Sequence, residues 1–424
     1  MSTFAGKSDF ANILLKIMEN TKYKLYPYRW VVLSAYMLII AVNQLLWITF
    51  APITSDAAKY FGVSDMQIGF LSMCFMIVFI IFSIPASWII DKYGIRIGVG
   101  IGALFTGLFG LMRGLVSMDF NSVLMSQIGI AIGQPFLLNA ITKLAARWFP
   151  IEDRATASGL GTLSMYIGIF GGMVLTPYLT SKTGIAFTLY IYGIISVVSA
   201  VLFFMFIKEN PPTPPCRPDQ EERSLVWDGF KNIFHIKDFN LLMVVFFIGL
   251  GIFNSVTTWI ENILGPRGFT ATQAGTVGGV MILAGIMGAF IMPVLSDHFR
   301  KRKPFIILAI IGATFGLAGI TFATSYWLMM FSGAVLGFFL LSSGPIGFQY
   351  GAEITYPISE GTSNGFLLLM GQISGVAFIF GLDFFKSPTG SMTQPLIVLI
   401  VLLVLLVLLT TRLKESVLIA DNDE

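Results

Sequence analysis

Apolar runs of about 20 residues recur about twelve times along the chain, and each could cross the hydrocarbon core of a bilayer as a helix. The most uniform run, PLIVLIVLLVLLVLLTT, lacks the alternation that a barrel strand needs. A composition of 55% hydrophobic and only 12% charged residues excludes a soluble domain. We therefore predict an all-α membrane protein of twelve transmembrane helices. The runs lie near residues 29–53, 66–90, 97–117, 122–147, 155–179, 185–207, 240–264, 272–295, 304–323, 327–349, 362–384 and 393–411.

Lys and Arg gather in alternate loops of this predicted bundle. If the N-terminus is cytoplasmic, the cytoplasmic segments hold most of the 26 Lys and Arg residues, in accord with the positive-inside rule. We therefore expect an integral protein of the inner or plasma membrane of a cell, with both termini in the cytoplasm. The chain then divides into a cytoplasmic leader, a six-helix bundle, a proline-rich cytoplasmic linker, a second six-helix bundle and a cytoplasmic tail, at residues 1–28, 29–207, 208–239, 240–411 and 412–424.

The two halves repeat one another in sequence. DKYGIR after the second run and DHFRKR after the eighth place Asp91 and Arg96 206 residues before Asp297 and Arg302. WFPIEDRATASG and TYPISEGTSNG, after the fourth and tenth runs, agree with this shift within one residue. The repeat predicts two pseudo-symmetric halves of six helices each. Parallel repeats about an axis normal to the membrane are typical of the major facilitator fold, whose substrate site lies at the midplane between the halves.

The loop DKYGIR also resembles the acid-and-base signature of major facilitator transporters, with a serine where the usual leading glycine would stand. Asp91 can accept hydrogen bonds from the start of a neighbouring helix, while Lys92 and Arg96 can pair with acids. Such contacts would hold one face of the bundle shut, so we predict a gating role for these residues and for Asp297 and Arg302. The alternative is that the basic residues only direct membrane insertion, although the recurring Asp favours a latch.

Polar side chains inside several runs share one face of their predicted helices. Amides and a carboxylate in hydrocarbon need partners or water, and one shared wet cavity would serve stripes from four helices. The competing interpretation is that a lone amide joins two helices, a contact worth about 1 kcal/mol. The stripes are Asn43 with Trp47, Gln127 with Gln134, Asn254 with Thr258 and Glu261, and Asn364 with Gln372.

Longer strings carry a closer family resemblance. NQLLWITFAP, GQPFLLNAITKLAARWFPIEDRATA and GAEITYPISEGTSNG resemble the transporters related to the feline leukaemia virus subgroup C receptor. The resemblance implies transport of an organic solute, with choline, ethanolamine and haem as the proposed cargo of some members. It also implies that Asn43, Trp47, Gln134 and Gln372 surround the central cavity.

Three residues bear on the substrate that this resemblance implies. The indole face of Trp47 attracts a quaternary ammonium or another cation, although a single tryptophan in a span is often only a packing residue. Related choline carriers place a tyrosine where this chain has Asn254, so the aromatic cage is incomplete. Glu261 stands where relatives have an amide. It could pair with a cationic head group, take up a proton and couple transport to pH, or lie at the lipid interface.

Two charged residues, one inside a predicted span and one just beyond another, complete the candidate set. Lys143 lies beyond Gln134 toward the cytoplasmic end of its run, where it can snorkel to the surface or pair with an acid. The acid that we expect opposite it is Glu353, from the related motif of the second half. We predict a gating or structural role for both residues.

We expect no cofactor and no metal. The two cysteines and two histidines lack ligand spacing, and the chain has no phosphate-binding loop, nucleophile elbow or zinc motif, so it is not predicted to be an enzyme. The expected partners are a small solute, the bilayer and, in one variant, protons; we expect a monomer and no nucleic acid. The prediction is a secondary transporter for a choline- or ethanolamine-like amine or another small polar solute, working by alternating access as a uniporter or with protons. The alternatives are a haem or organic-anion carrier of the same family and a receptor that binds without translocating.

Overall fold

The computed structural model describes residues 25–215, 233–356, 358 and 360–416, and these residues form long helices without a strand. Eleven of the helices are long and apolar enough to cross a membrane, or up to 12 spans if a bent pair counts as one. The predicted all-α fold of twelve spans is therefore confirmed. Most of the predicted leader and much of the predicted linker lie outside the described residues.

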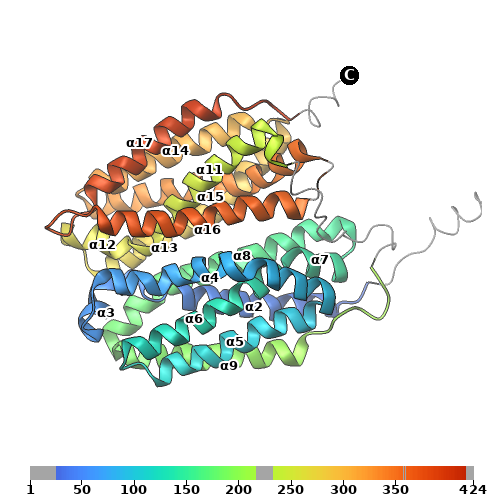
Figure 1. Cartoon of the computed structure of the whole chain (residues 1–424), viewed down its shortest axis with the longest axis horizontal. Helices are drawn as coiled ribbons and strands as arrows, with labels where there is room; N and C mark the ends of the chain where they lie inside the picture. The colour runs from blue at the N-terminus through green and yellow to red at the C-terminus, as the bar shows by residue number, and fades with distance from the viewer. Residues whose placement is uncertain (1–24, 216–232, 357, 359, 417–424) are drawn as a thin grey trace, which may run out of the picture.

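The first half of the chain forms one bundle, drawn in blue to green in Figure 1. Its first span is interrupted by the short 3-10 helix η1 (Ala51–Ile53). The helices are α2 (Tyr28–Ile48), α3 (Thr54–Phe61), α4 (Asp65–Tyr93), α5 (Ile95–Leu115), α6 (Phe120–Leu138), α7 (Ile141–Trp148), α8 (Ile151–Thr183) and α9 (Ile185–Phe206).

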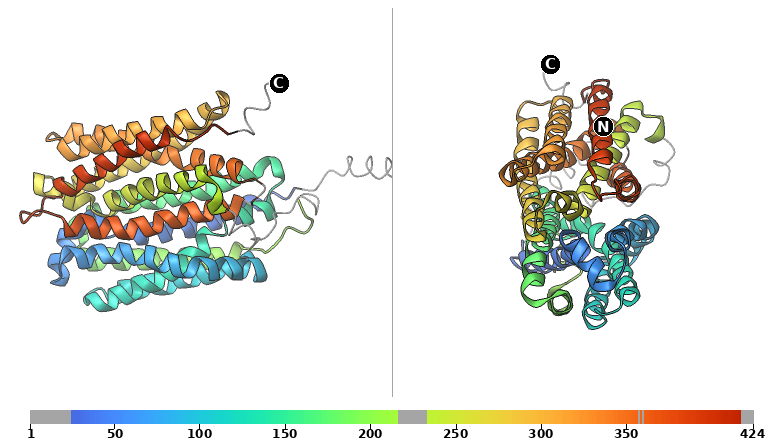
Figure 2. Two further views of the ribbon diagram at one scale, coloured as in Figure 1. Left: turned by 45° about the horizontal axis from the view of Figure 1, so that its top comes forward. Right: turned by 90° about the vertical axis from the view of Figure 1, so that its left-hand side faces the viewer.

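The second half forms the other bundle, and in the end-on view of Figure 2 the two bundles lie one above the other. We call the end of the molecule that carries α7 the terminal end, and the opposite end, which carries α3 and α12, the far end (Figure 1). The helices of the second half are α11 (Lys237–Thr258), α12 (Ile260–Leu264), α13 (Ala271–His298), α14 (Lys303–Phe322), α15 (Tyr326–Thr355), α16 (Glu360–Phe384) and α17 (Thr393–Thr410).

The second span of each half begins with the same helix cap. In α4, the Ser64 side chain accepts from the backbone N–H of Gln67, whose side chain accepts in return from the backbone N–H of Ser64. In α13, Thr270 and Gln273 make the same two reciprocal bonds. Both residues stand 206 positions after their counterparts, so the repeat seen in the loops extends to the helix starts.

The fourth predicted span is not one straight helix. It breaks between α6 and α7 with a bend of 40°. Pro135 lies one turn before the break and cannot donate a backbone hydrogen bond, which weakens the helix there. The side chain of Asn139, at the break itself, donates to Ser83 and Ser87 of α4, so the bend is fixed by contacts with a neighbouring helix.

Glycines allow the helices of each half to approach closely. A Cβ on Gly337 of α15 would collide with the backbone carbonyl of Met281 in α13. A Cβ on Gly168 of α8 would likewise collide with the carbonyl of Ala41 in α2. Such backbone-to-backbone packing is typical of helix association in membranes. In lipid there is no hydrophobic driving force between helices, so they associate through the close van der Waals contacts that small residues allow.

Candidate functional site

A carboxylate joins the two halves at the far end. One oxygen of Glu261 in α12 accepts from the backbone N–H of Ser55 at 3.0 Å and from its hydroxyl at 2.9 Å. Ser55 lies in the first turn of α3, where the helix dipole favours a negative charge. Beside this contact, Asn262 donates to Asp65 at 3.0 Å. Glu261 is only 7% exposed, so it does not occupy the lipid-interface position that was one of its three interpretations.

The far-end contact joins two positions that the internal repeat makes equivalent. Ser55 and Glu261 are 206 residues apart, the shift that relates the two halves. Two positions that are equivalent in a two-fold repeat can touch only where both are close to the axis that relates them. The closure therefore lies at the pseudo-two-fold axis.

Close packing of glycine supports this closure. A Cβ on Gly275 of α13 would collide with the carbonyl of Met173 in α8 and would come within 2.8 Å of Pro177 Cγ. It would also lie 3.3 Å from Cβ of Pro52 in η1. All three neighbours belong to the first half, so the halves meet at the far end with no room for a side chain.

Asn254 lies where the second half meets α4 of the first. Its side-chain amide donates to the carbonyl of Gly371 in α16 at 3.2 Å. A Cβ on Gly375 would approach the same amide nitrogen at 2.8 Å and would also press on the sulfur of Met76 in α4. Asn254 is therefore held at the boundary between the halves, beside the α16 segment that carries Gln372.

Trp47 reaches the same helix of the first half. Its indole N–H donates to the carbonyl of Ser72 in α4 at 3.1 Å, and the residue is buried. Ser72 and Met76 are four residues apart and share a face of α4. Trp47 and Asn254, which are distant in sequence, thus both lie near the 72–76 segment of α4.

Two of the predicted amides have no partner in the described part of the chain. Gln134 in α6 is buried and Gln372 in α16 is half-buried, yet neither side chain forms a hydrogen bond with another described residue. Some polar side-chain atoms of the described residues are both fully inaccessible and without a hydrogen bond, and neither amide is among them. Both amides are therefore in contact with open space. An unsatisfied amide at such a position can bind water or a polar ligand.

Asn43 differs from these amides because its side chain is fully occupied. It donates to the Thr106 hydroxyl at 3.1 Å and to the Ile130 carbonyl at 3.4 Å, and its oxygen accepts from Gln44. All of these residues belong to the first half. The contacts match the competing interpretation of a polar link between helices, and a direct role of Asn43 in binding stays a prediction.

At the terminal end of the first half, two ion pairs flank the loop between α4 and α5. Lys143 pairs with Asp91 at 2.7 Å and also donates to the Ile90 carbonyl. Arg147 pairs with Glu209, which follows α9. Glu209 also accepts from the first two backbone N–H groups of α5, at 3.0 and 2.7 Å, and so caps that helix.

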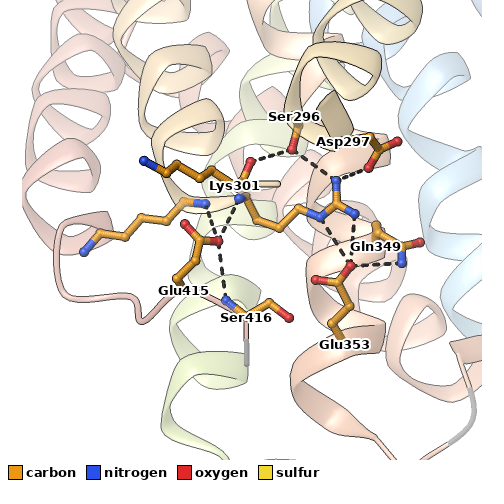
Figure 3. A network of polar contacts seen from close by, with 9 residues as sticks. Ser296, Asp297, Lys301, Gln349, Glu353, Glu415 and Ser416 are labelled. Atoms are coloured by element: carbon orange, nitrogen blue, oxygen red, sulfur yellow. Dashed lines mark hydrogen bonds and ion pairs between the residues drawn. The ribbon is translucent and has the colours of Figure 1, made fainter. Parts of the chain in front are cut away.

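The second half has a matching network around Arg302, which Figure 3 shows from close by. Arg302 pairs with Asp297 and, at 3.0 Å, with Glu353, which also accepts from Gln349. Glu415, which follows α17, accepts from the backbone N–H of Arg302 at 2.7 Å, at the start of α14. Burial alone would lower the pKa of Arg302, but hydrogen bonds from its guanidinium and the charges of Glu353 and Asp297 raise it above its ordinary value.

The predicted pairing of Lys143 with Glu353 across the halves is not formed. Each finds a partner in its own half, because in this conformation the halves are joined at the far end and not through these residues. Of the other predicted latch residues, Lys92 lies 4.7 Å from the centre of the Trp88 ring and forms no ion pair with a described residue. Arg96 is exposed and contributes its backbone N–H to the cap on α5.

Glu209 and Glu415 were missed in the sequence, although a signal for them existed. Each is the second residue of a Lys-Glu pair just beyond the last helix of its half. They are 206 residues apart, as are Asp91 and Asp297. A search along the repeat for acids rather than for the signature loop alone would have found both caps.

Comparison with known proteins shows which family the chain resembles. Residues 36–379 match the family model described as Major Facilitator Superfamily. The protein named Uncharacterized MFS-type transporter C09D4.1 from Caenorhabditis elegans is 29% identical over 91% of this chain and 69% of its own length. Solute carrier family 49 member A3 from Xenopus tropicalis is 29% identical over 85% of this chain and 78% of its own. The Homo sapiens choline/ethanolamine transporter FLVCR2 is 26% identical over 82% of this chain and 70% of its own.

A solved structure supports the fold. The bacterial homologue of the human lysosomal transporter Spinster, described as inward-facing and unoccupied, superposes with a TM-score of 0.71 at 17% identity. The superposition covers 91% of this chain and 97% of the homologue. The superposition confirms the predicted fold class, and the family model and the relatives confirm the predicted family resemblance.

Proposed function

This chain belongs to the major facilitator superfamily, and on that premise we propose that it carries a choline- or ethanolamine-like amine, or another small polar or cationic organic solute, by alternating access. Proteins of this superfamily are secondary transporters and not enzymes, so the chain is an integral membrane transporter. The solute class is supported by relatives named choline/ethanolamine transporters, which share 26% to 29% identity with this chain.

The observation that carries the proposal is a pair of amides, one in each half, that have no hydrogen-bond partner among the described residues and are not fully enclosed. Gln134 comes from the first half and Gln372 from the second, so a ligand bound between them would contact both. Asn254 lies where the second half meets α4, and Trp47 donates a hydrogen bond to the same helix. An indole face binds a desolvated cation with about 0.5–2 kcal/mol, which favours an ammonium head group over an anion.

We further propose that the terminal end faces the cytoplasm, as the distribution of Lys and Arg indicates. The far end, closed by Glu261 and Ser55, would then face outward. The ion pairs of Asp91 and Arg302 stay within their own halves, so neither residue cross-links the halves at the cytoplasmic end. Closure of that end would require Lys143 and Glu353 to exchange partners, and this exchange is the gating role that we assign to them.

The proposal predicts a specific loss of ligand stabilisation in Trp47→Ala. A ligand that binds only the folded protein stabilises it, by about 2.7 kcal/mol when the ligand concentration is 100 times Kd, and so raises its melting temperature. We therefore expect choline or another amine to raise the Tm of the purified parent protein but not of Trp47→Ala. Trp30→Ala is the matched control, because Trp30 lies on the same helix but is 42% exposed on its outer surface. Its response to the amine should equal that of the parent.

The same ligand panel tests the alternatives. It includes amino acids, vitamins and haem beside the amines. Stabilisation by haem or by an organic anion alone would contradict the proposal and would support the other carrier type. Binding of an amine without its uptake into proteoliposomes would contradict the transport step and would support a receptor.

We propose uniport as the mode of transport, with Glu261 serving closure of the far end. A pH gradient imposed on proteoliposomes should then fail to drive the amine above its external concentration. Glu261→Gln, which weakens the bonds from Ser55, should slow influx and efflux to the same degree. Uphill accumulation that follows the pH gradient and disappears in Glu261→Gln would overturn uniport and establish proton coupling.

A further inference from the structure

A buried arginine lies in the first half without an acidic partner. Arg113 of α5 is completely buried, and no described carboxylate forms an ion pair with it. A charge in such a place is costly unless hydrogen bonds or dipoles compensate it. Arg113 falls within the predicted run 97–117, and neither the predicted site nor the predicted latch uses it.

The partners of Arg113 are gathered at the break in the first span. Its guanidinium donates to the carbonyl of Leu46 at 2.9 Å, to the hydroxyl of Thr49 at 3.3 Å and to the side-chain oxygen of Gln127 at 2.8 Å. It also lies 5.6 Å from the centre of the Phe50 ring. Three of these four residues fall within the five positions where α2 stops and the chain turns into η1.

The chemistry of these contacts is that of a helix C-cap. The last four carbonyls of a helix have no partner within the helix, and they form the negative end of its dipole. Leu46 belongs to this last turn, and its carbonyl accepts from both Arg113 and the Gln127 amide. A guanidinium therefore finds its counter-charge in a helix end, which exists only because the span is broken there.

The break separates two parts of the first span that have different tasks. Trp47, beside the capped carbonyl, belongs to the proposed solute site. Pro52 and Ser55, beyond the break, pack against or bind the second half at the far end. Whatever fixes the break also fixes where the indole points and where η1 and α3 sit against α12 and α13.

We infer that Arg113 is a positioning residue that holds the first span in its broken form, so that closure of the far end and the placement of Trp47 depend on its cap. Gln127 assists by donating to the same carbonyl. This inference rests on the proposed alternating-access function, but the conformational test below uses no solute, so its outcome does not depend on which solute is carried.

The test measures the distance between spin labels across the far end. Lys59 in α3 and Thr324 between α14 and α15 are exposed, one in each half, and can be replaced by labelled cysteines after Cys74 and Cys216 are replaced by serine. In Arg113→Met the charge and its hydrogen bonds are lost. We expect the ratio of the short, closed-state distance to longer distances to fall roughly tenfold. Arg113→Lys keeps the charge and should restore most of the closed population.

A purely structural role would give a different result. If Arg113→Met lowers the melting temperature but leaves the distance distribution unchanged, the inference is overturned. Should Arg113→Met fail to fold, Gln127→Leu removes the second donor to the Leu46 carbonyl while leaving the arginine in place. It should produce the same shift in smaller measure, and an unchanged distribution in Gln127→Leu would likewise contradict the inference.

Discussion

Gly275→Val is expected to open the far end of the carrier and to slow transport at least roughly tenfold. The added side chain would collide with the Met173 carbonyl and crowd Pro177 and Pro52, all of which belong to the opposite half. Overpacking of this kind costs about 1–3 kcal/mol. The cost applies only while the halves touch, so the equilibrium should shift roughly 5–150-fold toward the conformation in which they separate. The measurement is the distance between labels at Lys59 and Thr324.

Gly337→Val is the matched control for this prediction. Its side chain would also collide with a backbone carbonyl, that of Met281, but both residues lie in the second half. The cost then falls on both conformations of the carrier. We expect a lower melting temperature and lower yield, with no change in the distribution of label distances.

Two results would contradict the account of the far end. An unchanged distance in Gly275→Val would mean that the contact between α13 and α8 does not distinguish the two conformations. Equal shifts in Gly275→Val and Gly337→Val would mean that the label distance reports general loosening of the protein and not separation of the halves.

The architecture of this chain was predictable because its signals are local. A run of about 20 apolar residues predicts a span wherever it stands, and a shift of 206 residues relates the two halves without knowledge of any contact. The break after Leu138 was not predictable in the same way. Pro135 weakens the helix, but the bend also depends on Ser83 and Ser87, which meet Asn139 only in the folded bundle.

The candidate site was predictable in part for a related reason. Helical spacing shows which residues share a face, and on that basis it predicted that Trp47, Gln134, Asn254 and Gln372 face a shared cavity. Spacing does not show whether a neighbouring helix already occupies an amide, as at Asn43.

Spacing also does not show which conformation the chain adopts, and the partners of charged residues depend on it. Lys143 pairs with Asp91 and not with Glu353 because the halves meet at the other end. Arg113 was beyond prediction for a further reason. Its partner is the end of a helix, and Pro52, the breaker nearest to that end, lies four residues beyond it and inside the predicted run 29–53.

Glu353→Gln is expected to destabilise the second half by about 3 kcal/mol, because it leaves a buried guanidinium with too little negative charge. The side chains of Arg302 and Glu353 are both only 8% exposed, and their pair spans 3.0 Å. Asp297 pairs with the same arginine but is 63% exposed, so Asp297→Asn should cost no more than about 1 kcal/mol. Denaturant unfolding of the two variants in the same detergent measures the difference.

A double variant decides whether the unpaired charge causes this loss. Replacing Arg302 by methionine in the Glu353→Gln background removes the buried charge, so the protein should regain much of the lost stability. If Arg302→Met with Glu353→Gln is no more stable than Glu353→Gln alone, the loss comes from the hydrogen bonds of Glu353, such as that from Gln349, and not from its charge. The attraction between Arg302 and Glu353 would then contribute little, and the proposed exchange of partners by Lys143 and Glu353 would fall with it.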